Sequence, residues 1–156
     1  MGTERQWFDG AGSDPEFEIN LDSLAANNYS VGAQADLGAS FVPYVFAWRV
    51  KIEMDDTPNA GESIQIYAAA ARDGASTVLD GGWSDTASDD QTDRDRLNNL
   101  KHIGNAYSDG QTMIYGSGQF VWWERYFSPV ILNATEEAIH NSTGDNTFII
   151  EDLVKA

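Results

Sequence analysis

Residues 41 to 54 read FVPYVFAWRVKIEM, and this stretch decides the fold. Every even position from 42 to 54 is apolar, whereas the later odd positions carry the charged residues Arg49, Lys51 and Glu53. Alternation with a period of two predicts a β-strand that buries one face and exposes the other. A strand this apolar needs a second layer, which the rest of the chain must supply.

Shorter segments elsewhere show the same alternation. Residues 63 to 70, SIQIYAAA, place β-branched residues before a run of alanines, which favours a strand over a helix. The turn-rich residues 55 to 61, DDTPNAG, precede them, so we expect this strand to pair antiparallel with residues 41 to 54. Further strands are predicted in the segments 17–21, 29–31, 100–108 and 147–154.

The second strongly apolar run is QTMIYGSGQFVWWERYFSPVIL, at residues 111 to 132. Its Gly-Ser-Gly triplet at 116–118 predicts a flexible turn that divides the run into two strands. Both faces of the second part are apolar, which predicts a strand that is buried on both sides or bulged near Glu124. Trp122 and Trp123 would then point to opposite faces, one into the core and the other outward.

One chain of 156 residues, 42% of them hydrophobic, suits one domain with a real core. We assign residues 1 to 14 to a glycine-rich N-terminal arm and residues 15 to 156 to the domain. Frequent turns without a convincing long helix predict an all-β fold, an antiparallel β-sandwich or jelly roll. Trp7 and Phe8 predict that the arm docks, either onto its own domain or onto a neighbouring subunit.

Charge and composition argue against several classes of partner. Nine Lys and Arg against 25 Asp and Glu give a net charge of −16, which predicts repulsion from nucleic acid and anionic membranes. This acidity serves either solubility or the binding of a basic partner or cations. We expect neither a membrane-spanning helix nor a secretory signal. The chain has no cysteine, which excludes disulfides and suits a protein made in a reducing cytosol.

The sequence contains no motif that predicts catalysis. His102 and His140 are its two histidines, and the serine of residues 116–118 lacks the frame of a nucleophile elbow. Glu124 is the best single carboxylate candidate because it lies among aromatic residues. A structural ion pair with Arg125 or with a neighbouring strand is the simpler interpretation. We therefore expect a protein that is not an enzyme.

One acidic loop contains weak candidates for a metal site. Asp85, Asp89, Asp90 and Asp93 lie close together in the sequence, and carboxylate oxygens are the ligands that Ca²⁺ prefers. They do not match the spacing of an EF-hand loop, and solvation of the loop is the simpler interpretation. We therefore expect no cofactor, with Ca²⁺ as the alternative.

Five aromatic residues are candidates for binding a partner protein: Trp7, Phe8, Trp83, Trp122 and Trp123. Aromatic side chains dominate the energetics of protein interfaces. Of the two adjacent tryptophans, only one is expected to lie at the surface. Packing against protein is the first interpretation for that residue, and stacking on a sugar ring is the alternative.

Three segments together resemble a group of small virion proteins of tailed bacteriophages. PNAGESIQIY at 58–67 matches a strand entry of the form P-x-A-G-x-x-I-x-Y, and RYFSPVILN at 125–133 matches a later R-Y-F/V-S-P-V-x-x-N strand. IIEDL at 149–153 stands in the place of a short closing strand, but it has Glu-Asp where the group has proline. These motifs are structural, so the resemblance implies no active residue.

The resemblance implies a β-sandwich in the virion, assembled in the cytoplasm of a bacterial host. We expect a capsid decoration (cement) protein that binds the major capsid protein or other virion proteins across capsid subunit junctions. A homo-oligomer, taken here as a trimer, would repeat one interface around an axis. The alternatives are a tail structural protein, a carbohydrate-binding module of a tail or head fibre, and a hydrolase.

Overall fold

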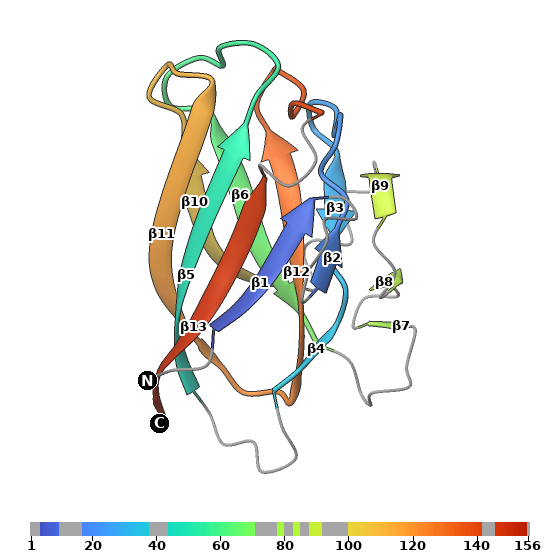
Figure 1. Cartoon of the computed structure of the whole chain (residues 1–156), viewed down its shortest axis with the longest axis vertical. Coiled ribbons are helices and arrows are strands. Elements are labelled where there is room, and N and C mark those ends of the chain that lie inside the picture. The colour runs from blue at the N-terminus through green and yellow to red at the C-terminus, as the bar shows by residue number, and fades with distance from the viewer. Residues whose placement is uncertain are drawn as a thin grey trace.

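The computed structural model describes residues 4–9, 17–37, 44–70, 78–79, 83–84, 88–91, 100–141 and 146–155 of the chain. Within these ranges every regular element is a β-strand, as the sequence predicts (Figure 1). Two mainly antiparallel sheets enclose a shared apolar interior, which makes the domain a β-sandwich of jelly-roll type. In this part of the chain no helix is long and apolar enough to cross a membrane.

Sheet A has five strands in the order β11-β5-β13-β1-β2. They are β1 (Glu4–Asp9), β2 (Phe17–Ile19), β5 (Tyr44–Glu53), β11 (Met113–Trp122) and β13 (Thr147–Lys155). Neighbours run antiparallel except β1 and β2, which are parallel. The strand predicted at 41–54 is β5, and it lies between β11 and β13.

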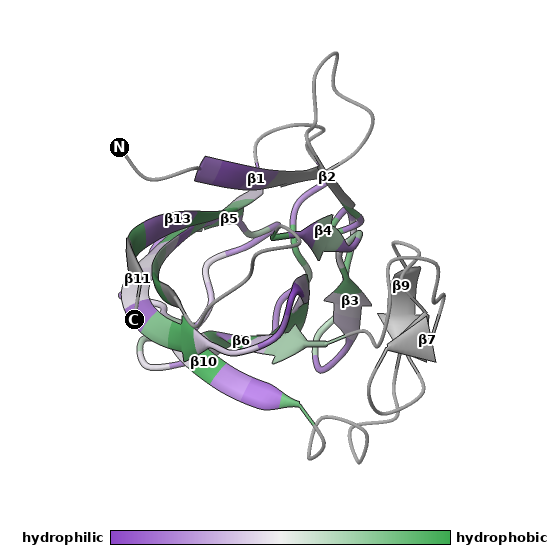
Figure 2. Ribbon diagram, turned by 90° about the horizontal axis from the view of Figure 1, so that it is seen from below, coloured by the Kyte–Doolittle hydropathy of each residue, from purple (hydrophilic) through white to green (hydrophobic). Residues whose placement is uncertain are grey.

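Sheet B has its main strands in the order β10-β6-β12-β3-β9. They are β3 (Tyr29–Val31), β6 (Ser63–Ala69), β9 (Ser88–Gln91), β10 (Lys101–Tyr107) and β12 (Tyr126–Ala134). The short β4 (Ala35–Asp36) also pairs with β12, and β7 (Val78–Leu79) pairs with β8 (Trp83–Ser84). Figure 2 shows the strands of both sheets arranged around one interior.

The predicted pairing of residues 63–70 with residues 41–54 is wrong. These residues do form a strand, but β6 lies in sheet B between β10 and β12, whereas β5 pairs with β11 and β13. The turn-rich residues 55–61 therefore carry the chain from one sheet to the other, with Gly61 at φ 93°. Alternation predicts which face a strand buries, but it does not predict the neighbouring strand.

The predicted turn at residues 116–118 is also wrong. β11 runs unbroken through the Gly-Ser-Gly triplet, and each of its residues is paired with β5. The chain turns instead at residues 123–125, between β11 and β12. The single strand predicted for the second part of the run is thus divided between β11 and β12, and β12 is buried on both faces over most of its length.

Part of the segment assigned to an N-terminal arm belongs to sheet A. Glu4–Asp9 form β1, which pairs with β13 on one side and β2 on the other. Trp7 lies opposite Phe148 and Phe17 in the backbone register. The backbone of these residues therefore pairs within its own chain, and docking of the Trp7 and Phe8 side chains stays a prediction. Residues 1–3 and 10–14 lie outside the described residues.

Aromatic rings connect the two sheets inside the core. Phe127 of β12 lies 5.7 Å from Phe120, 5.4 Å from Trp122 and 6.4 Å from Phe148, measured between ring centroids. The last three residues belong to sheet A, so one side chain of sheet B contacts two strands across the interior. Phe46 of β5 stacks on Phe120 at 5.4 Å and extends the cluster. Such edge and offset contacts add to the free energy of apolar burial.

Trp48 of β5 occupies a slot between the sheets that is lined by glycines. A Cβ atom at Gly104 of β10 would lie 2.2 Å from Cζ2 of the indole, and one at Gly118 of β11 would lie 2.7 Å from Nε1. A Cβ atom at Gly116 would lie 2.4 Å from the Cβ of Ala106. The triplet in β11 is therefore explained by close approach of strands and not by a turn.

Asn133, the last residue of the RYFSPVILN segment, joins two loops at the other end of β12. Its fully buried Nδ2 donates to the carbonyl oxygens of Leu24 at 3.0 Å and Glu137 at 2.7 Å. Its Oδ1 accepts from the N–H of Thr135 at 3.1 Å and from its hydroxyl at 2.8 Å. The asparagine of this motif thus has a structural explanation, because it satisfies buried polar groups.

We predict that Gly104→Ala lowers the free energy of unfolding by about 1–3 kcal/mol, because the new methyl group overlaps the Trp48 indole. Urea denaturation measures the change. In a Trp48→Phe background the smaller ring makes room, so the same substitution should cost less. Equal costs in the two backgrounds would contradict the proposed contact.

We predict that Asn133→Ala lowers the free energy of unfolding by about 2–4 kcal/mol, since it leaves several buried polar groups without partners. Thermal or urea denaturation checks this value. Glu136→Ala, on the exposed side of the same turn, is the matched control and should change stability by less than about 0.5 kcal/mol. Similar effects of the two substitutions would argue against the network.

Candidate partner-binding tip

Trp122 and Trp123 lie on opposite sides of the chain, as the sequence predicts. Trp122 is 4% exposed, packs edge-on against Phe127, and donates its indole N–H to the Tyr126 carbonyl at 3.2 Å. Trp123 is 63% exposed and is the first residue of the β11–β12 turn. The exposed member of the pair is therefore Trp123, and Trp122 belongs to the core.

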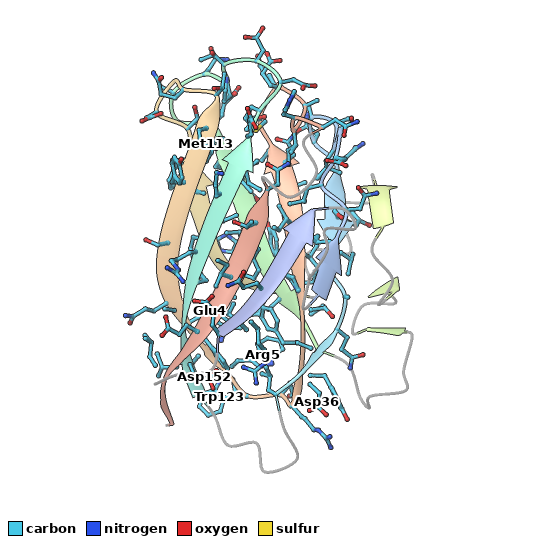
Figure 3. All side chains as sticks on the ribbon, viewed as in Figure 1. Glu4, Arg5, Asp36, Met113, Trp123 and Asp152 are labelled. Atoms are coloured by element: carbon cyan, nitrogen blue, oxygen red, sulfur yellow. The ribbon has the colours of Figure 1, made fainter. Side chains whose placement is uncertain are left out.

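Trp123 lies at one end of the sandwich. Figure 3 shows Trp123 and Asp36 at the opposite end from Met113. We call this end the Trp123 tip and define it by Asp36, Lys101 and residues 122–126. Its residues come from β4, β10, the end of β11 and the start of β12, so long-range pairing of the sheets assembles it.

An ion pair fixes the turn that presents Trp123. Arg125 Nε donates to one carboxylate oxygen of Asp36 at 2.8 Å, and Nη2 donates to the other at 2.6 Å. The Leu37 N–H donates to the Arg125 carbonyl at 2.8 Å, and the guanidinium carbon lies 4.9 Å from the centre of the Tyr126 ring. The hydrogen bond to Asp36 raises the pKa of Arg125. Of the two alternatives predicted for Glu124, an ion pair with Arg125 is wrong, since Arg125 pairs with Asp36.

A recess of about 200 Å³ lies beside the exposed indole. Lys101 donates a hydrogen bond from Nζ to the Val121 carbonyl at its side, and partial burial lowers the pKa of this lysine. The recess is lined by Ala68, Ala70, Leu100, Lys101, Trp122, Trp123 and Glu124. It therefore combines an apolar floor with one cation and one carboxylate at its rim.

This arrangement suits binding better than catalysis. Trp123 offers a large apolar surface on a turn whose geometry is already fixed, so little conformational entropy is lost when a partner covers it. Lys101 and Glu124 can complement opposite charges at the rim. Glu124 is exposed, and the recess does not bring it together with a second acid or a histidine among its lining residues.

The other predicted partner-binding residues belong to other elements. Trp7 and Phe8 lie in β1, opposite Phe148 and Thr147 in the backbone register, and Trp83 lies in β8 opposite Leu79. The placement of these three side chains lies outside what the structure describes. The described structure therefore assigns Trp123 alone, of the five candidates, to the exposed tip.

The predicted cation ligands fall largely on residues that are not described. Asp89 and Asp90 lie in β9, with side chains outside the described set, and Asp85 and Asp93 lie outside it altogether. Within the described ranges no group of three or more His, Cys, Asp or Glu side chains could hold a metal ion. Ca²⁺ binding by this loop stays a prediction.

Sequence reasoning did not find two of the tip residues. Asp36 lies 89 positions before its partner Arg125, and nothing in its local sequence indicates the pairing. Lys101 lies near the start of the strand predicted at 100–108. The local sequence does not indicate that its ammonium group contacts the Val121 carbonyl. Only the position of Arg125, directly after the Trp-Trp-Glu turn, was a usable signal.

Comparisons with known proteins yield structural likenesses only. No family model matches the chain, and no curated protein matches it. The fold is similar to Eiger TNF from S. frugiperda, with a TM-score of 0.48 and 8% identity over 99% of this chain and 94% of that one. Murine APRIL at pH 8.0 aligns with a TM-score of 0.45 and 7% identity over 98% of this chain and 100% of that one. Likenesses this distant carry no functional argument.

We predict that Trp122→Ala lowers the free energy of unfolding by about 3–5 kcal/mol, because it empties a core position, whereas Trp123→Ala changes it by less than about 0.5 kcal/mol. Chemical denaturation followed by far-UV circular dichroism checks both values. Equal losses for the two variants would show that Trp123 is packed against the rest of the molecule and is not available to a partner.

Proposed function

We propose that the protein is a non-catalytic structural component of a bacteriophage particle, a capsid decoration protein that binds the shell through its Trp123 tip. The observation that carries the proposal is the 63% exposure of Trp123 on a turn fixed by the Arg125–Asp36 pair. An exposed tryptophan that contributes little to its own fold is typical of an interface anchor. The proposed location, the bacteriophage particle, comes from the sequence resemblance to small phage virion proteins.

The sandwich suits a protein that acts by binding at a defined place on the shell and burying surface there. The first and last described strands, β1 and β13, pair with each other in sheet A, and Trp123 protrudes from one end of the sandwich. A decoration protein needs such a unit, because it must bind at shell junctions without changing its own fold. The net charge of −16 favours contact with basic surfaces and keeps finished particles apart.

The proposed assembly is a homo-oligomer, taken as a trimer, placed over junctions between capsid subunits. Repetition of a modest interface around a symmetry axis multiplies the effective affinity for the shell. Each copy would contribute one Trp123 tip, so that several weak contacts act together.

We predict that the protein co-sediments with empty capsids assembled from the major capsid protein of the same phage, and that Trp123→Ala weakens this association at least tenfold. The matched control is Tyr107→Ala, which removes an equally exposed aromatic ring (61%) from the end of β10. A native mass spectrum of the free protein, expected at three copies, checks the assembly in the same samples. Absence of co-sedimentation, or equal losses in both variants, would contradict the proposal.

A further inference from the structure

A groove of about 480 Å³ crosses the outer face of sheet A. The backbone register arranges its side chains in two rows across three strands: Tyr115, Lys51 and Thr147 in the first, and Ser117, Arg49 and Ile149 in the second. We call this the β5 groove and define it by these six residues. Neighbouring side chains in such rows lie within about 5 Å of one another, so all six can contact one ligand.

The lining side chains of the β5 groove include two cations and no carboxylate, although Glu53 follows Lys51 on the same face of β5. Lys51 and Arg49 are two of only nine basic residues in a chain of net charge −16, and they lie two positions apart on the same face of β5. Their side chains leave the strand roughly 6–7 Å apart. Two adjacent cations repel each other, and a carboxylate placed between them would relieve that repulsion.

The two cations differ in their existing partners. Arg49 Nη2 lies 2.8 Å from Glu4 Oε2 in an exposed ion pair. Within the described part of the chain, the Lys51 side chain has no ion pair or hydrogen bond, while its backbone is paired with β11 and β13. Lys51 is therefore ready for an anionic ligand, whereas Glu4 competes with such a ligand for Arg49.

The remaining groove residues offer hydroxyl groups, one aromatic ring and the apolar side chain of Ile149. Tyr115 is 66% exposed, and the hydroxyls of Ser117 and Thr147 lie on either side of the basic pair. A ring face, flanking hydroxyls and a volume within the usual range for small-ligand sites suit a short saccharide.

The backbone argues against a peptide strand as the ligand. Peptides that add to a sheet hydrogen-bond to a free edge. β5 and β13 are each paired on both sides, and β11, the edge strand of sheet A, lies beside β10. Recognition in the β5 groove must therefore come from side chains alone. Those side chains are two cations, three hydroxyl-bearing residues and Ile149, and the polar members suit an acidic sugar.

We propose that the β5 groove binds an acidic saccharide, with the carboxylate of a uronic-acid unit between Lys51 and Arg49 and its ring against Tyr115. The groove begins six residues before the Trp122–Trp123 end of β11, about 20 Å away along the strand. It therefore stays open when the tip is covered, and the inference does not rest on the proposed capsid role.

Isothermal titration calorimetry with trigalacturonate and a hyaluronan tetrasaccharide, against neutral galactotriose, tests the proposal. At least one acidic oligosaccharide should bind, and galactotriose should bind at least tenfold more weakly. Lys51→Gln should weaken acidic-sugar binding about tenfold, because it removes the unpaired charge. Glu4→Gln should strengthen it about two- to fivefold, because it releases Arg49 from its exposed ion pair.

The control is Lys155→Gln, which removes the same charge at the far end of β13 and should leave binding unchanged. Circular dichroism confirms that each variant is folded. Failure of both acidic oligosaccharides to bind, equal binding of galactotriose, or no effect of Lys51→Gln would overturn the proposal. Tighter, Lys51-dependent binding of a glutamate hexapeptide would also overturn it and assign the groove to acidic peptides.

Discussion

The insertion of Trp48 between the sheets is the contact on which the arrangement of β10 and β11 depends. These strands belong to different sheets, yet the indole from β5 lies against glycines of both. Side chains larger than hydrogen at positions 104 and 118 would push the strands apart. The indole N–H is buried without a hydrogen-bond partner in the described structure, which costs about 1–3 kcal/mol. Apolar burial of the large ring must exceed this cost.

The same contact determines what the surface presents. Because residues 116 and 118 face inward as glycines, Tyr115 and Ser117 face outward from an edge strand that is paired with β5 along its whole length. The outward-facing side chains of β5, β11 and β13 lie side by side in the register of the sheet. Arg49 and Lys51 of β5 therefore lie between hydroxyl groups and an aromatic ring. A packing requirement inside the sandwich thus shapes the β5 groove outside it.

Much of the fold could be predicted from local pattern. Alternation located β5, β10 and β13, and it indicated that Trp122 and Trp123 differ in burial. It could not predict the partner strands, so the expected hairpin between residues 41–54 and 63–70 does not exist. The glycines at 116 and 118 led to the wrong prediction of a turn. Glycine is common both in turns and where strands approach closely, and local sequence does not distinguish the two.

The candidate site was less predictable than the fold. The sequence indicates that one of two adjacent residues, Trp122 or Trp123, is exposed. It does not indicate that Asp36 pairs with Arg125 in the turn that carries the exposed tryptophan, because Asp36 is distant in the sequence. Likewise, alternation places Arg49 and Lys51 on the outer face, while their neighbours Tyr115 and Thr147 become apparent only from strand register. Both sites are therefore assembled by pairing between distant segments, which the local pattern of residues does not predict.

The joining of β1 to β13 has a consequence for how the chain acquires its structure during synthesis. Arg5 and Asp152, which form an ion pair at 3.2 Å, are separated by 147 positions, and β5 receives its β13 neighbour only from residues 147–155. Sheet A therefore cannot be completed until residues 147–155 have been synthesised, and its apolar strands are only partly covered until then. Such topology folds slowly and exposes nascent chains to aggregation. We therefore expect production in cells to be limited by chaperone capacity and temperature more than by the stability of the finished sandwich.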